Sequence, residues 1–163
     1  MLLLIALLSL LPIRSKGDPL SNRTLPVKDT NCAAPWMDGS AVGLGCLLFE
    51  SDIALTWYNA SAFCQDQKSA KLIAIESAEQ KEFVIMVIGF LSGHEATYNW
   101  WTSGVDQGRE AEWYWASTLT SVGSYIWAQD QPNAGTDDNC LYIKDGEGWD
   151  GDCTLYKCPI CEL

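Results

Sequence analysis

A helical pattern of apolar residues begins near residue 55. Trp57, Ala60 and Cys64 recur at spacings of three and four residues within residues 55–65, so one face of a helix is predicted to pack inward. Thr56 stands directly before this pattern and suits the N-cap position, because its hydroxyl can accept a hydrogen bond from a free backbone N–H.

A second helix is predicted to begin at Ser77, which forms a capping box with Gln80. We expect it to end near Gly93, since glycine commonly follows the last helical residue. The apolar positions assigned to its buried stripe are Phe83, Val87, Phe90 and Leu91.

The remaining apolar segments are short and favour strands. Residues 72–75 form an apolar run between the two helices, and from residue 99 aromatic segments alternate with turn residues. These later segments are residues 99–104, 112–117, 125–128, 139–144 and 156–163. Two helices followed by short strands predict one α+β domain.

The N-terminal residues resemble a secretion signal. Residues 2–13 are almost entirely apolar, which is the length of a signal-peptide core and too short for a membrane-spanning helix. Ser15 and Gly17 offer a small-residue cleavage site. A short signal anchor is the alternative, because Arg14 and Lys16 follow the apolar core instead of preceding it. The predicted parts are a signal peptide at 1–17, an N-terminal arm at 18–31 and a globular domain at 32–163.

Cysteine content and charge agree with a secreted, extracellular protein. The chain has seven cysteines, which suits an oxidising compartment, although sequence alone does not choose their pairing. Asn22 and Asn59 lie in glycosylation motifs. The net charge of −11 disfavours nucleic acid and anionic membranes as partners, since both attract Lys and Arg. No other apolar run approaches the length of a membrane span.

Residues 131–153, here called the acidic segment, carry the candidate chemistry. Six carboxylates lie in it, opposed within the segment by Lys144. They are Asp137, Asp138, Asp145, Glu147, Asp150 and Asp152. Carboxylate and amide oxygens suit Ca²⁺, and a disulfide between Cys140 and Cys153 would hold such ligands together. The alternative is a solvated acidic loop closed by the same disulfide.

Two other groups of residues invite functional interpretations. Aromatic rings stack on sugars, but most tryptophans in a disulfide-stapled domain fill its core. The tryptophans in question are Trp100, Trp101, Trp113, Trp115 and Trp127. An enzyme is disfavoured, because His94 is the single histidine and Cys158-x-x-Cys161 lies on a predicted strand, away from the helix start that redox chemistry requires.

Taken in order, these motifs resemble the long form of the C-type lectin-like domain, and especially its secreted invertebrate members. The matching stretches are CAAPWMDGSAVGLGC, TWYNASAFC, SAEQKEFV, WWTSGVD with EWYWAS, QPNAGTDDNC and GWDGDCTLYKCPICE. The resemblance implies an opening hairpin and the disulfides Cys32–Cys46, Cys64–Cys161 and Cys140–Cys153. It leaves Cys158 unpaired, so that this thiol is either buried or available for a disulfide-linked dimer.

The resemblance also implies a calcium site that binds sugar hydroxyls. The ligands carried over are Gln131, Asn133, Asp138 and Asp150, all of which would also contact carbohydrate, and the family's cis peptide falls on Gln131–Pro132. Asp152 replaces the last ligand, because WDGDC is one residue shorter than the usual motif. The amides of Gln131 and Asn133 flank the proline on both sides, which leaves the choice between mannose-like and galactose-like sugars open.

The function implied is that of a secreted lectin that binds glycans with Ca²⁺ as cofactor, in innate immune recognition or agglutination. The alternative is the same fold binding a protein or other ligand without sugar. A second, accessory calcium site is expected to be weak or absent. Asp106 and Glu110 match two of its ligands, whereas Ala134 and Asn139 replace two acidic ones.

Overall fold

The computed structural model describes residues 32–92, 98–133 and 135–163. Its helical elements are α1 (Trp57–Asp66), α2 (Ala78–Ser92) and the 3₁₀ turns η1 (Ser40–Val42) and η3 (Ser124–Ile126). Its strands are β1 (Met37–Asp38), β2 (Cys46–Phe49), β3 (Lys71–Leu72), β4 (Trp100–Val105), β5 (Tyr114–Trp115), β6 (Thr120–Ser121), β7 (Cys140–Lys144), β8 (Glu147–Gly151) and β9 (Cys158–Glu162). The predicted α+β class is confirmed. The predicted signal peptide and N-terminal arm, together with Asn22 and His94, lie outside the described residues.

Helix α1 confirms the periodicity argument. Its buried residues are Trp57, Ala60 and Cys64, and the Thr56 hydroxyl accepts a hydrogen bond from the backbone N–H of Asn59 (3.4 Å). The Trp57 indole donates to the carbonyl of Thr102 in β4 (2.8 Å), so the helix is joined to the sheet at its first turn.

Helix α2 begins as predicted, but its buried stripe differs. The backbone N–H of Gln80 donates to the Ser77 hydroxyl (3.2 Å), while the Gln80 side chain accepts from the N–H of Glu76 (2.6 Å). Val84 and Val87 are buried, whereas Phe90 is 82% exposed and Leu91 is also exposed. The stripe assignment of Phe90 and Leu91 was wrong, because apolar residues occupy all sides of this helix and periodicity cannot single out one of them.

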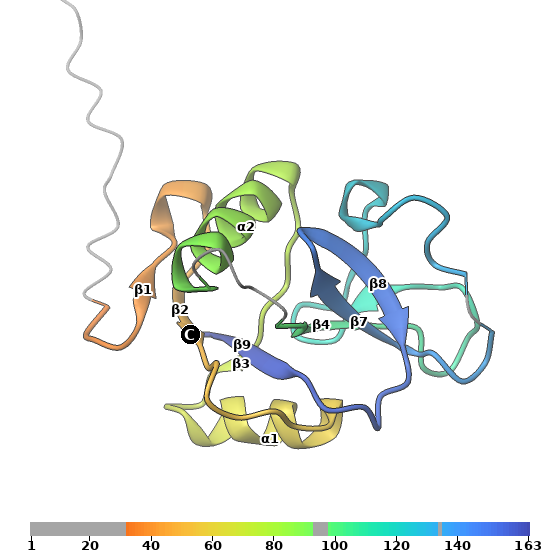
Figure 1. Ribbon diagram of the computed structural model, residues 1–163, viewed down its shortest axis with the longest axis horizontal. Helices are drawn as coiled ribbons and strands as arrows, with labels where there is room; N and C mark the ends of the chain where they lie inside the picture. Colours follow the sequence, from red (N-terminus) through yellow and green to blue (C-terminus); the bar gives the residue numbers. More distant parts are fainter. Residues whose placement is uncertain (1–31, 93–97, 134) are drawn as a thin grey trace, which may run out of the picture.

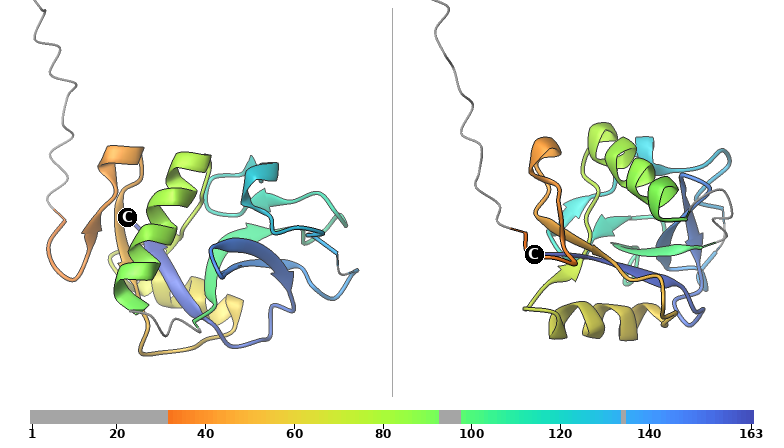
Figure 2. Two further views of the ribbon diagram at one scale, coloured as in Figure 1. Left: turned by 45° about the horizontal axis from the view of Figure 1, so that its top comes forward. Right: turned by 60° about the vertical axis from the view of Figure 1, so that its left-hand side comes forward.

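The strands join into one sheet in the order β1-β2-β9-β4-β5-β6, with β3 beside β9 and the β7–β8 pair attached to β4. Pairing is antiparallel except between β4 and β9. Figures 1 and 2 show α1 and α2 on opposite sides of β2 and β9. The segment between η3 and β7 lies at the end of the domain away from the C-terminus (Figure 1).

Two strand predictions need correction. The run 72–75 is buried as expected, but only Lys71–Leu72 is strand. Residues 125–128 contain the end of η3 and a single bridge from Trp127 to Gly148 instead of a strand. The hydroxyl of Tyr125 donates to the carbonyl of Ile75 (2.8 Å), so tertiary contact fixes this aromatic segment without a ladder of its own.

The core forms two clusters, one on each face of the sheet. Trp100 belongs to the cluster with Val84 and Trp101 to the cluster with Ala60, as expected when neighbouring strand residues point to opposite faces. Trp115 is fully buried as well. Three of the five tryptophans considered are therefore core residues, whereas Trp113 and Trp127 are only half-buried.

The disulfides are Cys32–Cys46, Cys64–Cys161 and Cys140–Cys153, as the resemblance implied. Cys158 is free and buried, in the opposite core cluster from Cys161. Its sulfhydryl donates to the carbonyl of Ser51 (3.8 Å). A disulfide-linked dimer needs an exposed sulfur, so the structure supports burial of Cys158 over dimerisation.

We expect Cys158 to be protected from thiol reagents in the folded protein. Burial raises the pKa of its thiol, and the charges of Glu50 and Asp52 raise it further, so the reactive thiolate is scarce as well as covered. In denaturant, a chromogenic disulfide reagent should release about one equivalent of chromophore per protein, from Cys158. In buffer the same release should occur only at the rate at which the protein unfolds. Rapid labelling in buffer, or a dimer band that disappears in Cys158→Ser, would contradict this prediction.

Candidate functional site

The acidic segment is only partly a loop. Strands β7 and β8 form a hairpin inside it, joined by Asp145 and Gly146, whose φ angles are 51° and 80°. Two consecutive positive φ angles are typical of the two-residue turn that Asp-Gly favours. That dipeptide signal was available in the sequence and was missed. The hairpin places Asp150 opposite Leu141. Asp150 also lies beside the chain that follows η3, at residues 131 and 133.

Three of the predicted ligands lie in direct contact. The carboxylate of Asp150 accepts a hydrogen bond from the backbone N–H of Asn133 (2.9 Å), and its own N–H donates to the side-chain oxygen of Gln131 (3.4 Å). The Gln131–Pro132 peptide is cis, as the resemblance implied for the calcium-bound form. The structure therefore brings Gln131, Asn133 and Asp150 together, although Asp150 stands 17 residues or more further along the chain.

Asp138 and Asp152 form the other half of the candidate site. The carboxylate of Asp138 is hydrogen-bonded by the backbone N–H of Asp152. Asp152 turns one carboxylate oxygen, Oδ1, toward Thr154, accepting from both its N–H and its hydroxyl (2.8 Å each). These bonds lower the pKa of Asp152.

The electrostatics of the site are repulsive. Burial raises the pKa of the Asp138 carboxyl, and the charges of Asp150, Asp152 and Asp137 raise it further. Burial also raises the pKa of Asp106, to which Asp150 adds a smaller contribution. A cation among these groups would offset the repulsion.

A buried lysine from outside the acidic segment faces the same carboxylates. The Lys157 ammonium lies 4.1 Å from the ring centre of Tyr142 and 4.8 Å from that of Trp101. Burial lowers its pKa, while Asp138 and Asp152 act in the opposite direction. Lys157 was not predicted as a site residue, because it follows the acidic segment and only the folded chain, through its bridge to Leu55, turns it toward Asp138. Lys157 thus partly balances the charge that a metal ion would neutralise.

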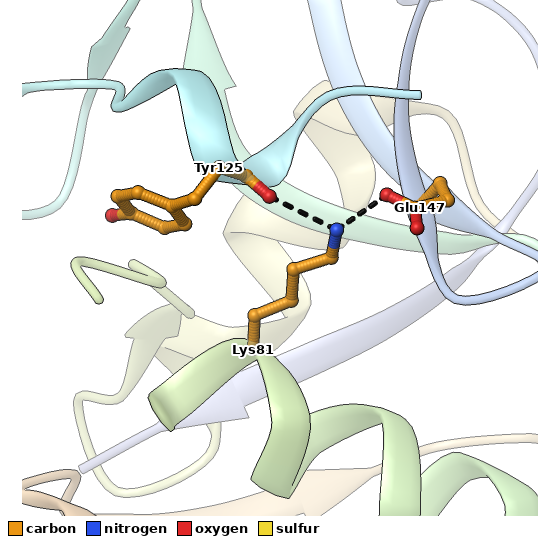
Figure 3. A network of polar contacts seen from close by, with 3 residues as sticks. All are labelled: Lys81, Tyr125 and Glu147. Atoms are coloured by element: carbon orange, nitrogen blue, oxygen red, sulfur yellow. Dashed lines mark hydrogen bonds and ion pairs between the residues drawn. The ribbon is translucent and has the colours of Figure 1, made fainter. Parts of the chain in front are cut away.

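Glu147 has a structural partner. Its carboxylate pairs with Lys81 of α2, which also donates to the carbonyl of Tyr125 in η3 (3.0 Å). Figure 3 shows the ammonium between these two acceptors. The contact joins α2, η3 and the start of β8, so Lys81 fixes the framework from which the segment after η3 departs.

The oxygen donors of the candidate site are of the type that binds calcium, but few carboxylates lie close together. Within residues 32–92, 98–133 and 135–163, no three His, Cys, Asp or Glu side chains gather closely enough to hold a metal ion. The contacts described above instead join the side chain of Gln131 and the backbone of Asn133 to Asp150, while Asp138 is coupled to Asp150 by charge. Amide and carboxylate oxygens are the hard ligands that Ca²⁺ takes, and loop positions allow its flexible geometry.

Residues matching the accessory site lie beside this group. Asp106 is buried, and its Oδ2 accepts from the N–H of Ala111 (3.0 Å), while its Oδ1 has no hydrogen-bond partner among the described residues. Asn139 donates its side-chain amide to the carbonyl of Thr136 (2.7 Å). Glu110 is exposed, and Ala134 lies outside the described residues.

The redox interpretation of Cys158-x-x-Cys161 fails on pairing. Cys161 is bonded to Cys64, and both sulfurs are buried within the sheet–α1 cluster. The two cysteines of the motif belong to different core clusters, so their side chains cannot meet.

Comparison with known proteins agrees with this arrangement. The sequence profile of the lectin C-type domain matches residues 53–163. The chain is 29% identical to mouse lithostathine-1 over 122 residues, covering 72% of each protein. It is 27% identical to human C-type mannose receptor 2 over 141 residues, which span 84% of this chain and 9% of the receptor.

The fold is shared with solved structures as well. A calcium-independent type II antifreeze protein superposes with a TM-score of 0.67 at 24% identity, covering 81% of this chain and 93% of the other. Among the described residues no helix is long and apolar enough to cross a membrane. The profile match extends over most of the chain and includes both helices and every strand from β3 to β9. This protein therefore belongs to the family defined by the lectin C-type domain.

Proposed function

We propose that this protein is a secreted lectin that binds glycans through a calcium ion held in the acidic segment. The observation that carries the proposal is the contact of Gln131 and Asn133, in the loop before β7, with Asp150 of β8. Asp138 and Asp152 supply further carboxylates, and the Cys140–Cys153 disulfide ties the two ends of that hairpin together. The name of one relative, C-type mannose receptor 2, is consistent with a sugar ligand.

The chemistry proposed for the site combines metal and hydrogen-bond recognition. Bound calcium supplies coordination positions for two vicinal hydroxyls of a sugar. Carboxylates of Asp138 and Asp150 accept hydrogen bonds from these hydroxyls, and the amides of Gln131 and Asn133 can donate to them. Because each hydroxyl needs both an acceptor and a donor, the order of acids and amides around the site selects the hydroxyl geometry.

The test is a glycan array probed with the protein in calcium and again in chelator. The proposal expects a set of glycans bound in calcium and released by chelator. Binding that is equal in both conditions would contradict a calcium-dependent lectin. No glycan bound in either condition, with a protein shown to be folded, would contradict sugar recognition altogether.

The second candidate is the same fold with a ligand other than sugar. Two observations favour it: the described residues gather no three metal-binding side chains, and a structural relative is a calcium-independent antifreeze protein. Calorimetric titration with Ca²⁺ separates the candidates, since the lectin requires binding and the alternative does not. We retain the lectin as the leading function because Gln131 and Asn133 both contact Asp150, which supports a shared site for these proposed ligands.

Secretion and glycosylation belong to the same proposal. Asn59 is exposed in the first turn of α1, where an attached glycan meets no core residue. A soluble, glycosylated lectin of this kind would serve recognition of microbial or self glycans, or agglutination. Secretion into culture medium, with a mass that falls on enzymatic deglycosylation, checks this part.

Sugar preference should respond to Gln131. Two amides flank Pro132, so the triplet lacks the acid–amide order that discriminates hydroxyl geometries. We expect Gln131→Glu to shift array binding toward mannose-type ligands, by about tenfold relative to galactose-type ligands. Asp130→Asn, one residue earlier and exposed, is a control for altered loop charge and should leave the preference unchanged. Identical profiles for Gln131→Glu and wild type would show that the triplet does not control selectivity.

A further inference from the structure

A cleft of about 530 Å³ lies directly beside the proposed sugar site. Trp113 and Trp127 form its aromatic wall, Glu112, Ser121 and Ser124 supply polar groups, and Pro132 forms its edge. The volume is within the range of about 300–1,000 Å³ typical of small-molecule pockets.

The two tryptophans of this cleft differ from Trp100, Trp101 and Trp115 in their burial. Trp100, Trp101 and Trp115 are at most 1% exposed, whereas Trp113 and Trp127 are half-buried. Their rings pack edge to face with centroids 4.8 Å apart, and each rests against the core cluster below. Core packing therefore accounts for only one side of each ring, and the remaining surface is available to a ligand.

Backbone hydrogen bonds hold the chain at both tryptophans of the cleft. The N–H of Val122 donates to the carbonyl of Trp113 (3.0 Å), and the N–H of Ala128, next to Trp127, donates to Gly148 (2.9 Å). Rings that are already ordered lose little conformational entropy when a ligand binds, which favours affinity. The cleft is thus a preformed surface.

The polar groups define the ligand class. Hydroxyls of Ser121 and Ser124 can donate and accept, while Glu112 only accepts. Glu112 is paired with Arg109 (2.8 Å), but both side chains are largely exposed. Among the described residues lining the cleft there is a carboxylate and no cation, which disfavours sulfated or acidic ligands. A ligand that suits this cleft has an apolar face to lie on the tryptophan rings and hydroxyls around its edge to bond the serines and Glu112. A neutral sugar ring has both features.

Pro132 fixes the relation of the cleft to the proposed calcium site. Its neighbours Gln131 and Asn133 are proposed sugar ligands, while Pro132 itself borders the cleft. We propose that the Trp113–Trp127 cleft binds a second, neutral sugar ring of an oligosaccharide whose first ring occupies the calcium site. This inference rests on the proposed function and extends it from a monosaccharide to an oligosaccharide ligand.

The test fills the cleft without altering the tryptophans or the acidic segment. Ser124 is exposed in η3 and lines the cleft, so Ser124→Trp places a ring in the space. Ser51→Trp is the matched control, since Ser51 is also exposed and does not line the cleft. Calorimetry in calcium compares methyl α-mannoside with mannotriose, and methyl β-galactoside with galactotriose, for all three proteins.

We expect wild type and Ser51→Trp to bind one trisaccharide at least about tenfold more tightly than its methyl glycoside. In Ser124→Trp this ratio should fall below about twofold, with the methyl glycoside affinity retained. A ratio near one in wild type, or an unchanged ratio in Ser124→Trp, would overturn the inference while leaving the proposed function intact. If neither methyl glycoside binds in calcium, the proposed function fails, and the inference fails with it.

Discussion

Replacing Asp138 with alanine is expected to weaken calcium binding at least about 100-fold, beyond the 10–100-fold typical of losing a partner that only orients a ligand. Asp138 is a proposed direct ligand, half-buried and coupled by charge to Asp150 and Asp152. Its raised pKa reports that the ionised carboxylate is disfavoured in the protein without metal. A bound cation would remove that penalty, so the variant loses both a ligand and the charge that attracts the ion.

Asp137→Ala provides a matched control for this experiment. Asp137 directly precedes Asp138 and is exposed. Its replacement by alanine removes the same formal charge from the same segment. We expect its calcium affinity to remain within about threefold of wild type, because exposed charges at this distance are screened. Equal losses in the two variants, measured by calorimetry, would mean that the segment attracts calcium only through its overall charge.

In chelator, Asp138→Ala is expected to affect the stability of the folded protein and not its calcium affinity. The pKa of Asp138 is raised above its unfolded value, so the folded state binds more protons as pH falls toward the unfolded pKa of 3.8. Stability without metal should therefore decrease as pH rises through this window. Asp138→Ala should reduce this decrease and should not destabilise the calcium-free protein at neutral pH.

Local patterns predicted the parts of this fold that depend on local interactions. The stripe of α1 and the Thr56 cap follow from spacing and hydrogen-bond chemistry within one helical turn. Phe90 could not be placed correctly, because α2 is apolar on every side and only the position of the sheet decides which side is buried. Strand β8 was missed because its sequence, EGWDG, has weak strand propensity and is held by pairing with β7.

The candidate site was predictable in composition and not in geometry. The choice of Gln131, Asn133 and Asp150 follows from matching motifs, and in the structure Asp150 is hydrogen-bonded to both of the other residues. Lys157 could not be anticipated as a neighbour of Asp138, since its position depends on tertiary contacts with Leu55, Trp101 and Tyr142. Glu147 was counted with the other acidic residues, although its partner Lys81 comes from α2.

Removal of the Cys64–Cys161 disulfide is expected to cause the largest loss of stability. The bond joins α1 to β9 across a sequence separation of 97 residues, and both cysteines are fully buried. A crosslink restricts the unfolded chain more when its loop is longer, and a loop of about 100 residues corresponds to about 4.7 kcal/mol. That figure is close to the whole stability of a marginal domain. The double variant Cys64→Ala/Cys161→Ala avoids leaving a thiol that could pair with Cys158.

The Cys32–Cys46 disulfide supplies the internal comparison, because it closes a separation of only 14 residues in the opening hairpin. Its removal, as Cys32→Ala/Cys46→Ala, should cost about 3 kcal/mol. Urea unfolding of the three proteins gives the free energies of unfolding and their order. The expectation is that the short-loop variant remains folded at 25 °C while the long-loop variant is largely unfolded. A greater loss in the short-loop variant would show that the opening hairpin, and not the α1–β9 link, limits the stability of this domain.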